Sequence, residues 1–223
     1  MKKLLMICGI SAAILYIGTV ILGGLIRPGY SHISMAISEL VADGAPNRSL
    51  LSSLFLLYNL MVILFGTGLF LKANSQPRGR VSGLIGSLSL VLVGIAGVLM
   101  ELAFAQEPGG TATTFAGTMH MVMAGVASLG TMVAVLFVGL WFKSLSEWKG
   151  YVTYSLVSVA IIFVSGGLTA TAMANQSPVF GLSERITIGT FIAWLFFVGL
   201  KMAQREEAAG QPFALAESTS KGN

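Results

Sequence analysis

Six runs of apolar residues limit what this chain can fold into. They cover residues 4–26, 51–72, 82–104, 117–142, 151–173 and 184–203. A helix needs about 20 mostly apolar residues to cross the hydrocarbon core of a membrane, and these runs lack the alternation that barrel strands require. Only 10% of the residues are charged, too few to cover a water-facing surface. We therefore expect an all-α membrane protein with one six-helix transmembrane domain over residues 1–204 and a disordered cytoplasmic tail over 205–223.

The distribution of Lys and Arg predicts the orientation of these helices. With the N-terminus in the cytoplasm, 10 of the 13 basic residues fall on the cytoplasmic side and 3 fall outside, namely Arg27, Arg48 and Arg185. This bias obeys the positive-inside rule and predicts a multi-pass protein of the cytoplasmic membrane with both termini inside. It also accounts for the net charge of +4, so we expect no nucleic-acid partner.

The first apolar run also resembles a signal peptide, because it follows two lysines. Its apolar stretch is longer than the usual core of a signal, which favours an uncleaved first helix. Cys8 lies in this helix, and we interpret it as a small buried apolar residue.

The longest polar interruption, residues 27–48, separates the first two runs. Ser31 can cap a short helix that Gly44-Ala45-Pro46 would end. Helical spacing places Ile33, Ile37, Leu40 and Val41 on one face, and His32, Glu39 and Asp43 in a stripe on another. We therefore expect an amphipathic helix at the outer membrane interface.

Other ionisable residues fall near the outer ends of the predicted helices. Ionisable side chains in membrane helices are rare and mark functional sites, so we interpret these residues together with the first loop as an outer-face pocket. The candidate ligand-binding residues are His32, Glu39, Arg48, Glu184 and Arg185. The candidate catalytic residues are Glu101 and His120, as an acid and a base. An ion-pair network that fixes the loops explains the same residues equally well.

Metal binding finds weaker support. The two histidines, His32 and His120, are far apart in the sequence and belong to no HxxxH or HExxH motif, which disfavours both zinc and haem. The methionines around His120 are soft ligands that suit copper, but methionine is also a common apolar filler. We assign no metal residue, and the sequence identifies no cofactor.

Small and polar residues inside the runs predict contacts between helices. Asn59 needs a hydrogen-bonding partner in hydrocarbon and should face another helix. The glycines expected to allow close approach are Gly66, Gly68, Gly83, Gly86, Gly94 and Gly97. We expect Asn47 or Ser49 to cap the second long helix and Ser183 to cap the last.

Three segments resemble a prokaryotic six-helix membrane family catalogued as a domain of unknown function, number nine-nine-eight. They are Ser38 to Asn47 after the first helix, Gly117 to His120 at the start of the fourth, and Gly181 to Arg185 before the sixth. Many relatives carry an acidic, proline-rich segment before the histidine, where this chain has only Glu107-Pro108. The resemblance implies the same topology and the same outer-face residues, and it implies no activity.

We interpret the chain as a protein that binds or senses a lipid or small amphiphile at the outer leaflet. The first loop would form a lid, and Arg185 and His120 would be polar anchors. The alternative is a membrane-embedded acid/base or metal-dependent enzyme, and a small transporter is a third hypothesis. Membrane lipids are the expected partners, and the sequence does not identify a protein partner.

Overall fold

Six long helices make up most of the computed structural model, which describes residues 2–210. They are α1 (Lys2–Ile26), α2 (Arg48–Asn74), α3 (Arg80–Leu102), α4 (Phe115–Phe142), α5 (Lys149–Ala174) and α6 (Phe180–Gly210). Three short 3₁₀ helices join them: η1 (Ser38–Val41), η2 (Pro108–Gly110) and η3 (Ser146–Trp148). The described residues contain no strand, and all six long helices are long and apolar enough to cross a membrane. The expected all-α, six-helix architecture is confirmed.

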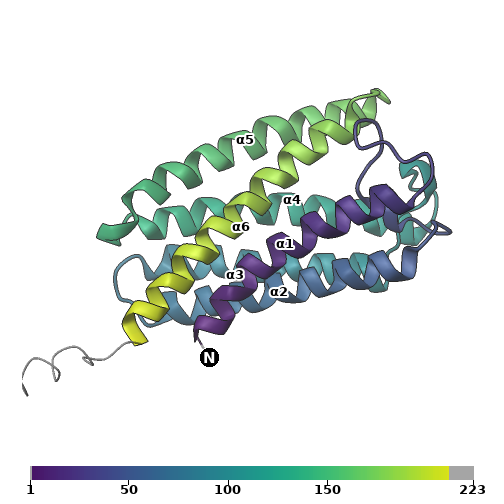
Figure 1. Cartoon of the computed structure of the whole chain (residues 1–223). Coiled ribbons are helices and arrows are strands. Elements are labelled where there is room, and N and C mark those ends of the chain that lie inside the picture. The colour runs from purple at the N-terminus through teal and green to yellow at the C-terminus, as the bar shows by residue number, and fades with distance from the viewer. Residues whose placement is uncertain (1, 211–223) are drawn as a thin grey trace, which may run out of the picture.

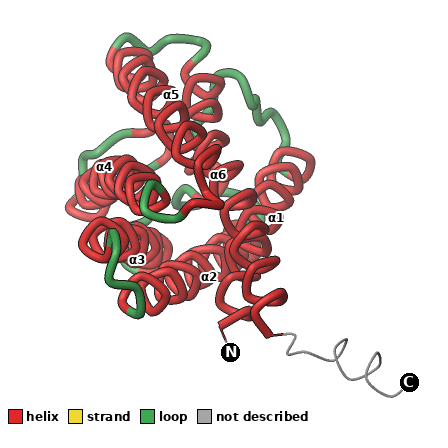
Figure 2. Tube along the Cα trace, turned by 90° about the vertical axis from the view of Figure 1, so that its left-hand side faces the viewer, coloured by secondary structure: helices red, strands yellow, loops and turns green. Residues whose placement is uncertain are grey.

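The six helices form a closed ring. Each helix packs against the next along the chain, and α6 also packs against α1, so the first and last helices are neighbours. Figure 1 shows the helices running side by side, and Figure 2 shows the ring nearly end-on. Successive helices run in opposite directions, so residues 27–47, 103–114 and 175–179 all lie at one end, here called the first-loop end. Residues 2 and 210 lie at the other, the termini end.

Glycines allow the close contacts between neighbouring helices. A Cβ on Gly86 of α3 would lie 2.6 Å from the backbone nitrogen of Val138 in α4. A Cβ on Gly97 would overlap the side-chain amide of Asn59, which is buried between α2 and α3. The expectation that Asn59 faces another helix is therefore confirmed, as is the expected close approach at these glycines.

The predicted amphipathic helix over residues 31–43 is wrong. The chain there forms turns followed by η1, and the expected stripe of polar residues does not exist: His32 and Asp43 are exposed, whereas Glu39 is buried. The reason is that the local backbone bonds form separate turns, while other backbone groups of this loop bond to distant parts of the molecule. Ile33 O accepts from Leu182 N at 2.9 Å, and Asp43 N donates to Gln106 O at 2.8 Å.

The last helix is longer at both ends than we expected. It begins at Phe180, so Ser183 lies inside the first turn and donates to Phe180 O at 2.8 Å instead of capping the helix. It continues to Gly210, past the expected start of the tail at residue 205. Ion pairs hold this extension, because Glu206 pairs with Lys72 and Glu207 pairs with Lys3 at 3.1 Å. Residues 211–223 of the predicted tail lie outside the described residues.

The cap of α2 also differs from a standard one. Asn47 occupies the predicted position with a left-handed backbone (φ 58°), but its side chain accepts no hydrogen bond from the helix.

Candidate functional site

The candidate residues all lie at the first-loop end, but they fall into three groups rather than one pocket. Arg185 and Glu184 bind the first loop. His120 contacts the loop between α3 and α4. Glu101 contacts the start of α2, near Arg48. The side-chain contacts therefore do not support the expected pocket shared by Glu101, His120 and Arg185.

Arg185 fastens the first loop to α6. Its Nη1 donates to Met35 O at 2.9 Å and to Gly181 O at 2.8 Å, and its Nη2 donates to the Tyr30 hydroxyl at 2.5 Å. The Tyr30 hydroxyl in turn donates to Ala36 O at 2.8 Å. Burial raises the pKa of Tyr30, an effect that the nearby Arg185 charge opposes, so the phenol stays neutral and can donate. These bonds use both terminal nitrogens of Arg185.

Two carboxylates complete this arrangement. Glu184 Oε2 accepts from the backbone nitrogen of Ile37 at 2.7 Å. Glu39 pairs with Arg27 across 3.6 Å, and both side chains are mostly buried. We call the set Arg27, Tyr30, Glu39, Glu184 and Arg185 the clamp. The clamp contains two arginines and two glutamates, and its ion pair between Arg27 and Glu39 fits the ion-pair network that the sequence left open as an alternative.

His32 lies exposed at the edge of the clamp. Its ring meets that of Tyr30 edge-on, with 5.1 Å between centroids. Partial burial and the positive charge of Arg185 lower the pKa of His32, so the neutral imidazole is favoured.

His120 is buried at the start of α4. Its Nδ1 lies 2.8 Å from Phe104 O, which fixes the imidazole against the loop after α3. The same loop carries Glu107, whose carboxylate accepts from the backbone nitrogens of Thr113 and Thr114 at 3.0 and 2.6 Å. The hydroxyl of Thr114 and these backbone donors hold the pKa of Glu107 well below its usual range. This loop therefore closes on the N-terminus of α4 by its own bonds.

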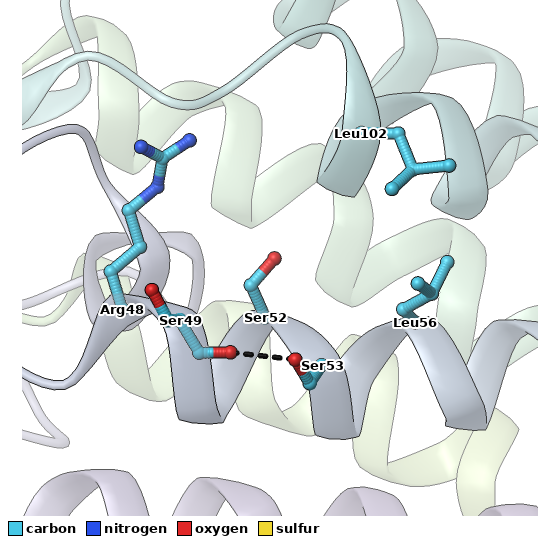
Figure 3. Close-up of a pocket in the computed structure, with 6 residues that line it drawn as sticks. All are labelled: Arg48, Ser49, Ser52, Ser53, Leu56 and Leu102. Atoms are coloured by element: carbon cyan, nitrogen blue, oxygen red, sulfur yellow. Dashed lines mark hydrogen bonds between the residues drawn. The ribbon is translucent and has the colours of Figure 1, made fainter.

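The third group lines a groove between the start of α2 and the end of α3. The groove has a volume of about 300 Å³, and its lining residues are Arg48, Ser49, Ser52, Ser53, Leu56 and Leu102. We call it the Arg48 groove (Figure 3). Arg48, Ser52 and Leu56 follow each other at intervals of four and point to the same side of α2. The lining thus changes from charged through hydroxyl to apolar along the helix.

Glu101 does not line this groove but is bonded to Ser52, which does. Its Oε2 accepts from the hydroxyl of Ser52 at 2.5 Å. Arg48 Nη1 donates to Asp43 at 2.9 Å, in a pair whose side chains are 37% and 73% exposed. An exposed pair of this kind contributes at most about 1 kcal/mol, so Arg48 can exchange Asp43 for another anion.

A smaller hollow of about 140 Å³ lies between α1 and α6. Its lining is apolar apart from Tyr16 and Arg185. The terminal nitrogens of Arg185 are bonded within the clamp, whereas its buried Nε has no hydrogen-bond partner among the described residues.

Within residues 2–210, no group of three or more His, Cys, Asp and Glu side chains could hold a metal ion. His32 and His120, the histidines of the zinc hypothesis, lie in different groups.

Sequence reasoning missed the serines of the groove and the role of Glu107. The segment RSLLSSL contains Ser49, Ser52 and Ser53, which are spaced by three and four residues and hence lie near one another on a helix. That spacing beside an arginine was a usable signal. Glu107 gave none, because its partners are brought to it by the shape of its own loop.

Six apolar helices with polar groups gathered at their ends make this chain a multi-pass membrane protein. A family model described as "Protein of unknown function (DUF998)" matches residues 10–201, and the chain belongs to this family. The resemblance stated from the sequence is therefore confirmed. No curated protein and no solved structure matches the chain.

Proposed function

We propose that the protein binds the polar head group of a membrane lipid or similar amphiphile in the Arg48 groove. The observation that carries this proposal is the order of side chains along the groove, from Arg48 through Ser52 to Leu56. A rise of 1.5 Å per residue puts Leu56 about 12 Å deeper than Arg48 along α2. An amphiphile needs that same gradient, with its head group at the interface and its chains in hydrocarbon.

The available hydrogen-bonding groups also support binding here rather than at the clamp. Arg48 spends one terminal nitrogen on an exposed partner, whereas Arg185 spends both on oxygens of the protein itself. We therefore replace Arg185 and His120 with Arg48 as the polar anchor. The other predicted ligand residues, His32, Glu39 and Glu184, act in this proposal by holding the first loop in place.

The test compares lipids that remain bound after gentle extraction of the full chain. Mass spectrometry of wild-type protein should detect a retained lipid, and Arg48→Gln should lose it. Arg78→Gln, at the termini end, is the matched control and should retain it. Equal retention by wild type and Arg48→Gln would refute the proposal.

We infer further that the first-loop end faces outward from the cytoplasmic membrane, because it carries 3 of the 13 basic residues. Asp43 is 73% exposed at its side chain and suits labelling. In a Cys8→Ser background, Asp43→Cys should react with a membrane-impermeant maleimide in intact cells, and Lys149→Cys should not. The opposite labelling pattern would reverse the orientation.

An enzyme is the second candidate, and the contact between Ser52 and Glu101 favours it. Glu101 accepts a hydrogen bond from the Ser52 hydroxyl, which is the geometry of a general base beside a nucleophile. His120, the other predicted catalytic residue, would act here only on the neighbouring loop. The retained lipid should then be chemically converted on incubation, and Glu101→Gln should stop conversion without releasing the lipid.

A further inference from the structure

A basic side chain lines the Arg48 groove, and an acidic side chain is bonded to its lining. Arg48 is the basic side chain. Within the described residues, its guanidinium donates a hydrogen bond to Asp43 alone. Glu101 is the acidic one; it lies next to the lining, because its carboxylate accepts a hydrogen bond from the lining residue Ser52. A ligand in the groove therefore has a donor in the lining and an acceptor next to Ser52.

Glu101 restricts the chemistry of that ligand. Its Oε2 is bonded to Ser52, while its Oε1 has no hydrogen-bond partner among residues 2–210. An ionised carboxylate can accept hydrogen bonds but cannot donate them. A purely anionic head group would bring its oxygens against this carboxylate and be repelled, whereas an N–H donor would satisfy it.

Arg48 and the serines restrict the chemistry of the other part of the ligand. The hydroxyl of Ser49 has no bond to any other described residue, whereas Ser53 donates to Ser49 O at 2.7 Å. Arg48 and Ser49 thus offer unused donors at the mouth of the groove. Guanidinium and hydroxyl donors together suit the oxygens of a phosphate.

The size and walls of the groove narrow the choice further. A volume of about 300 Å³ lies at the lower limit of ordinary ligand pockets, enough for a head group whose chains run outside along Leu56 and Leu102. Aromatic side chains bind a quaternary ammonium through their ring faces, and the lining residues include none. An ammonium group of the ligand must therefore be one that donates hydrogen bonds.

We propose that the head group bound in the Arg48 groove is a phosphoethanolamine, with its phosphate on Arg48 and Ser49 and its primary ammonium on Glu101. This inference rests on the proposed function and names its ligand class. Lipid is the source that Leu56 and Leu102 favour, and a water-soluble phosphoethanolamine carries the same polar chemistry.

The test titrates the full chain with phosphatidylethanolamine, phosphatidylcholine and phosphatidylglycerol of matched chains, followed by native mass spectrometry. Wild type should bind phosphatidylethanolamine roughly tenfold more tightly than the other two, because they leave Glu101 without a donor. Glu101→Gln should remove most of this preference, since its amide still accepts from Ser52 but carries no charge. Arg48→Gln should weaken all three lipids.

Controls and contrary outcomes separate the two proposals. Glu147→Gln removes a carboxylate at the termini end, where it pairs with Arg205, and should leave the preference unchanged. Equal binding of the three lipids that still requires Arg48 overturns the phosphoethanolamine assignment and leaves the proposed function standing. Binding that ignores Arg48 overturns both. Glycerophosphoethanolamine binding as tightly as the lipid supports the head-group chemistry and overturns the membrane source.

Each variant is first compared with wild type by melting temperature and size-exclusion profile. If Glu101→Gln does not fold, Ser52→Ala serves in its place. It removes the bond that orients Glu101 and should lower the preference, and an unchanged preference in a folded Ser52→Ala counts against the assignment.

Discussion

The clamp and the Arg48 groove lie at the same end of the bundle and contain the same kinds of residue, yet they use them in opposite ways. In the clamp, Arg185 donates three hydrogen bonds to oxygens of the protein. In the groove, Arg48 makes one bond, to the exposed Asp43. The comparison shows that an arginine at a membrane helix end is either internal support or an available binding group, and that its partners decide which.

The largest expected effect is on the clamp. Arg185→Ala removes three charge-assisted hydrogen bonds and leaves Met35 O and the Tyr30 hydroxyl without their donor, which should lower the free energy of unfolding by about 3 kcal/mol. The melting temperature in detergent should fall, and amides of residues 30–37 should exchange faster with deuterium. Arg205→Ala, which removes an exposed pair from the same helix, is the control. Equal losses of melting temperature in both variants would show that the clamp contributes no more stability than an exposed ion pair.

A glycine beside the clamp should give the next largest effect. A Cβ on Gly181 would overlap Met35 O, a backbone atom that cannot move without displacing the first loop. Gly181→Ala should therefore cost about 2 kcal/mol, the typical penalty of overpacking. On the same helix, a Cβ on Gly189 meets no atom within 4 Å, so Gly189→Ala should be neutral or slightly stabilising. Thermal unfolding of the two variants checks this difference, and a tolerant Gly181→Ala would mean that the loop is held loosely.

The groove should respond far less in stability. Arg48→Gln breaks an exposed ion pair, so the free energy of unfolding should change by no more than about 1 kcal/mol. The same variant should lose its retained lipid, so stability and binding separate here as they do not in the clamp. If Arg48→Gln destabilises as much as Arg185→Ala, the distinction between support and binding group fails.

The smallest expected effect concerns pH. The pKa of His32 is lowered in the folded protein, mainly by partial burial and also by Arg185, so protonation favours the unfolded state. Its stabilising contribution is present above the ordinary histidine pKa of about 6.5 and is lost as the pH falls below it. His32→Gln should therefore lose slightly less melting temperature than wild type between pH 7.5 and pH 5. An equal loss of melting temperature in the two proteins would mean that the pKa of His32 is not lowered by its surroundings in the folded protein.

The helices could be predicted because their signal is local. Length and hydropathy alone define a membrane span, and a polar side chain within a span is expected to face another helix, as Asn59 faces Gly97. Every predicted span corresponds to a helix of the structure; the ends differ by at most three residues in the first five helices and by four and seven residues in α6.

The site could be predicted only as far as its end of the bundle. The helical spacing of residues 31–43 was real, but its backbone finds better partners in Glu184 and Arg185, which lie about 150 positions further along the chain. A tertiary contact of this range overrides local periodicity and leaves no trace in the segment itself. The same limit explains why Arg185 and Arg48 looked alike in the sequence.

The closed ring of helices has a consequence for the order in which the protein can be completed. The first loop is made early, but Glu184 and Arg185, which hold it, belong to the last helix synthesised. Until α6 enters the membrane, the carbonyl of Met35 and the amide of Ile37 have no partner there, and α1 lacks one of its two neighbours. The first loop therefore reaches its final shape last, and a chain truncated before Phe180 would lack the bonds from Glu184 and Arg185 while keeping the bond from Asp43 to Gln106.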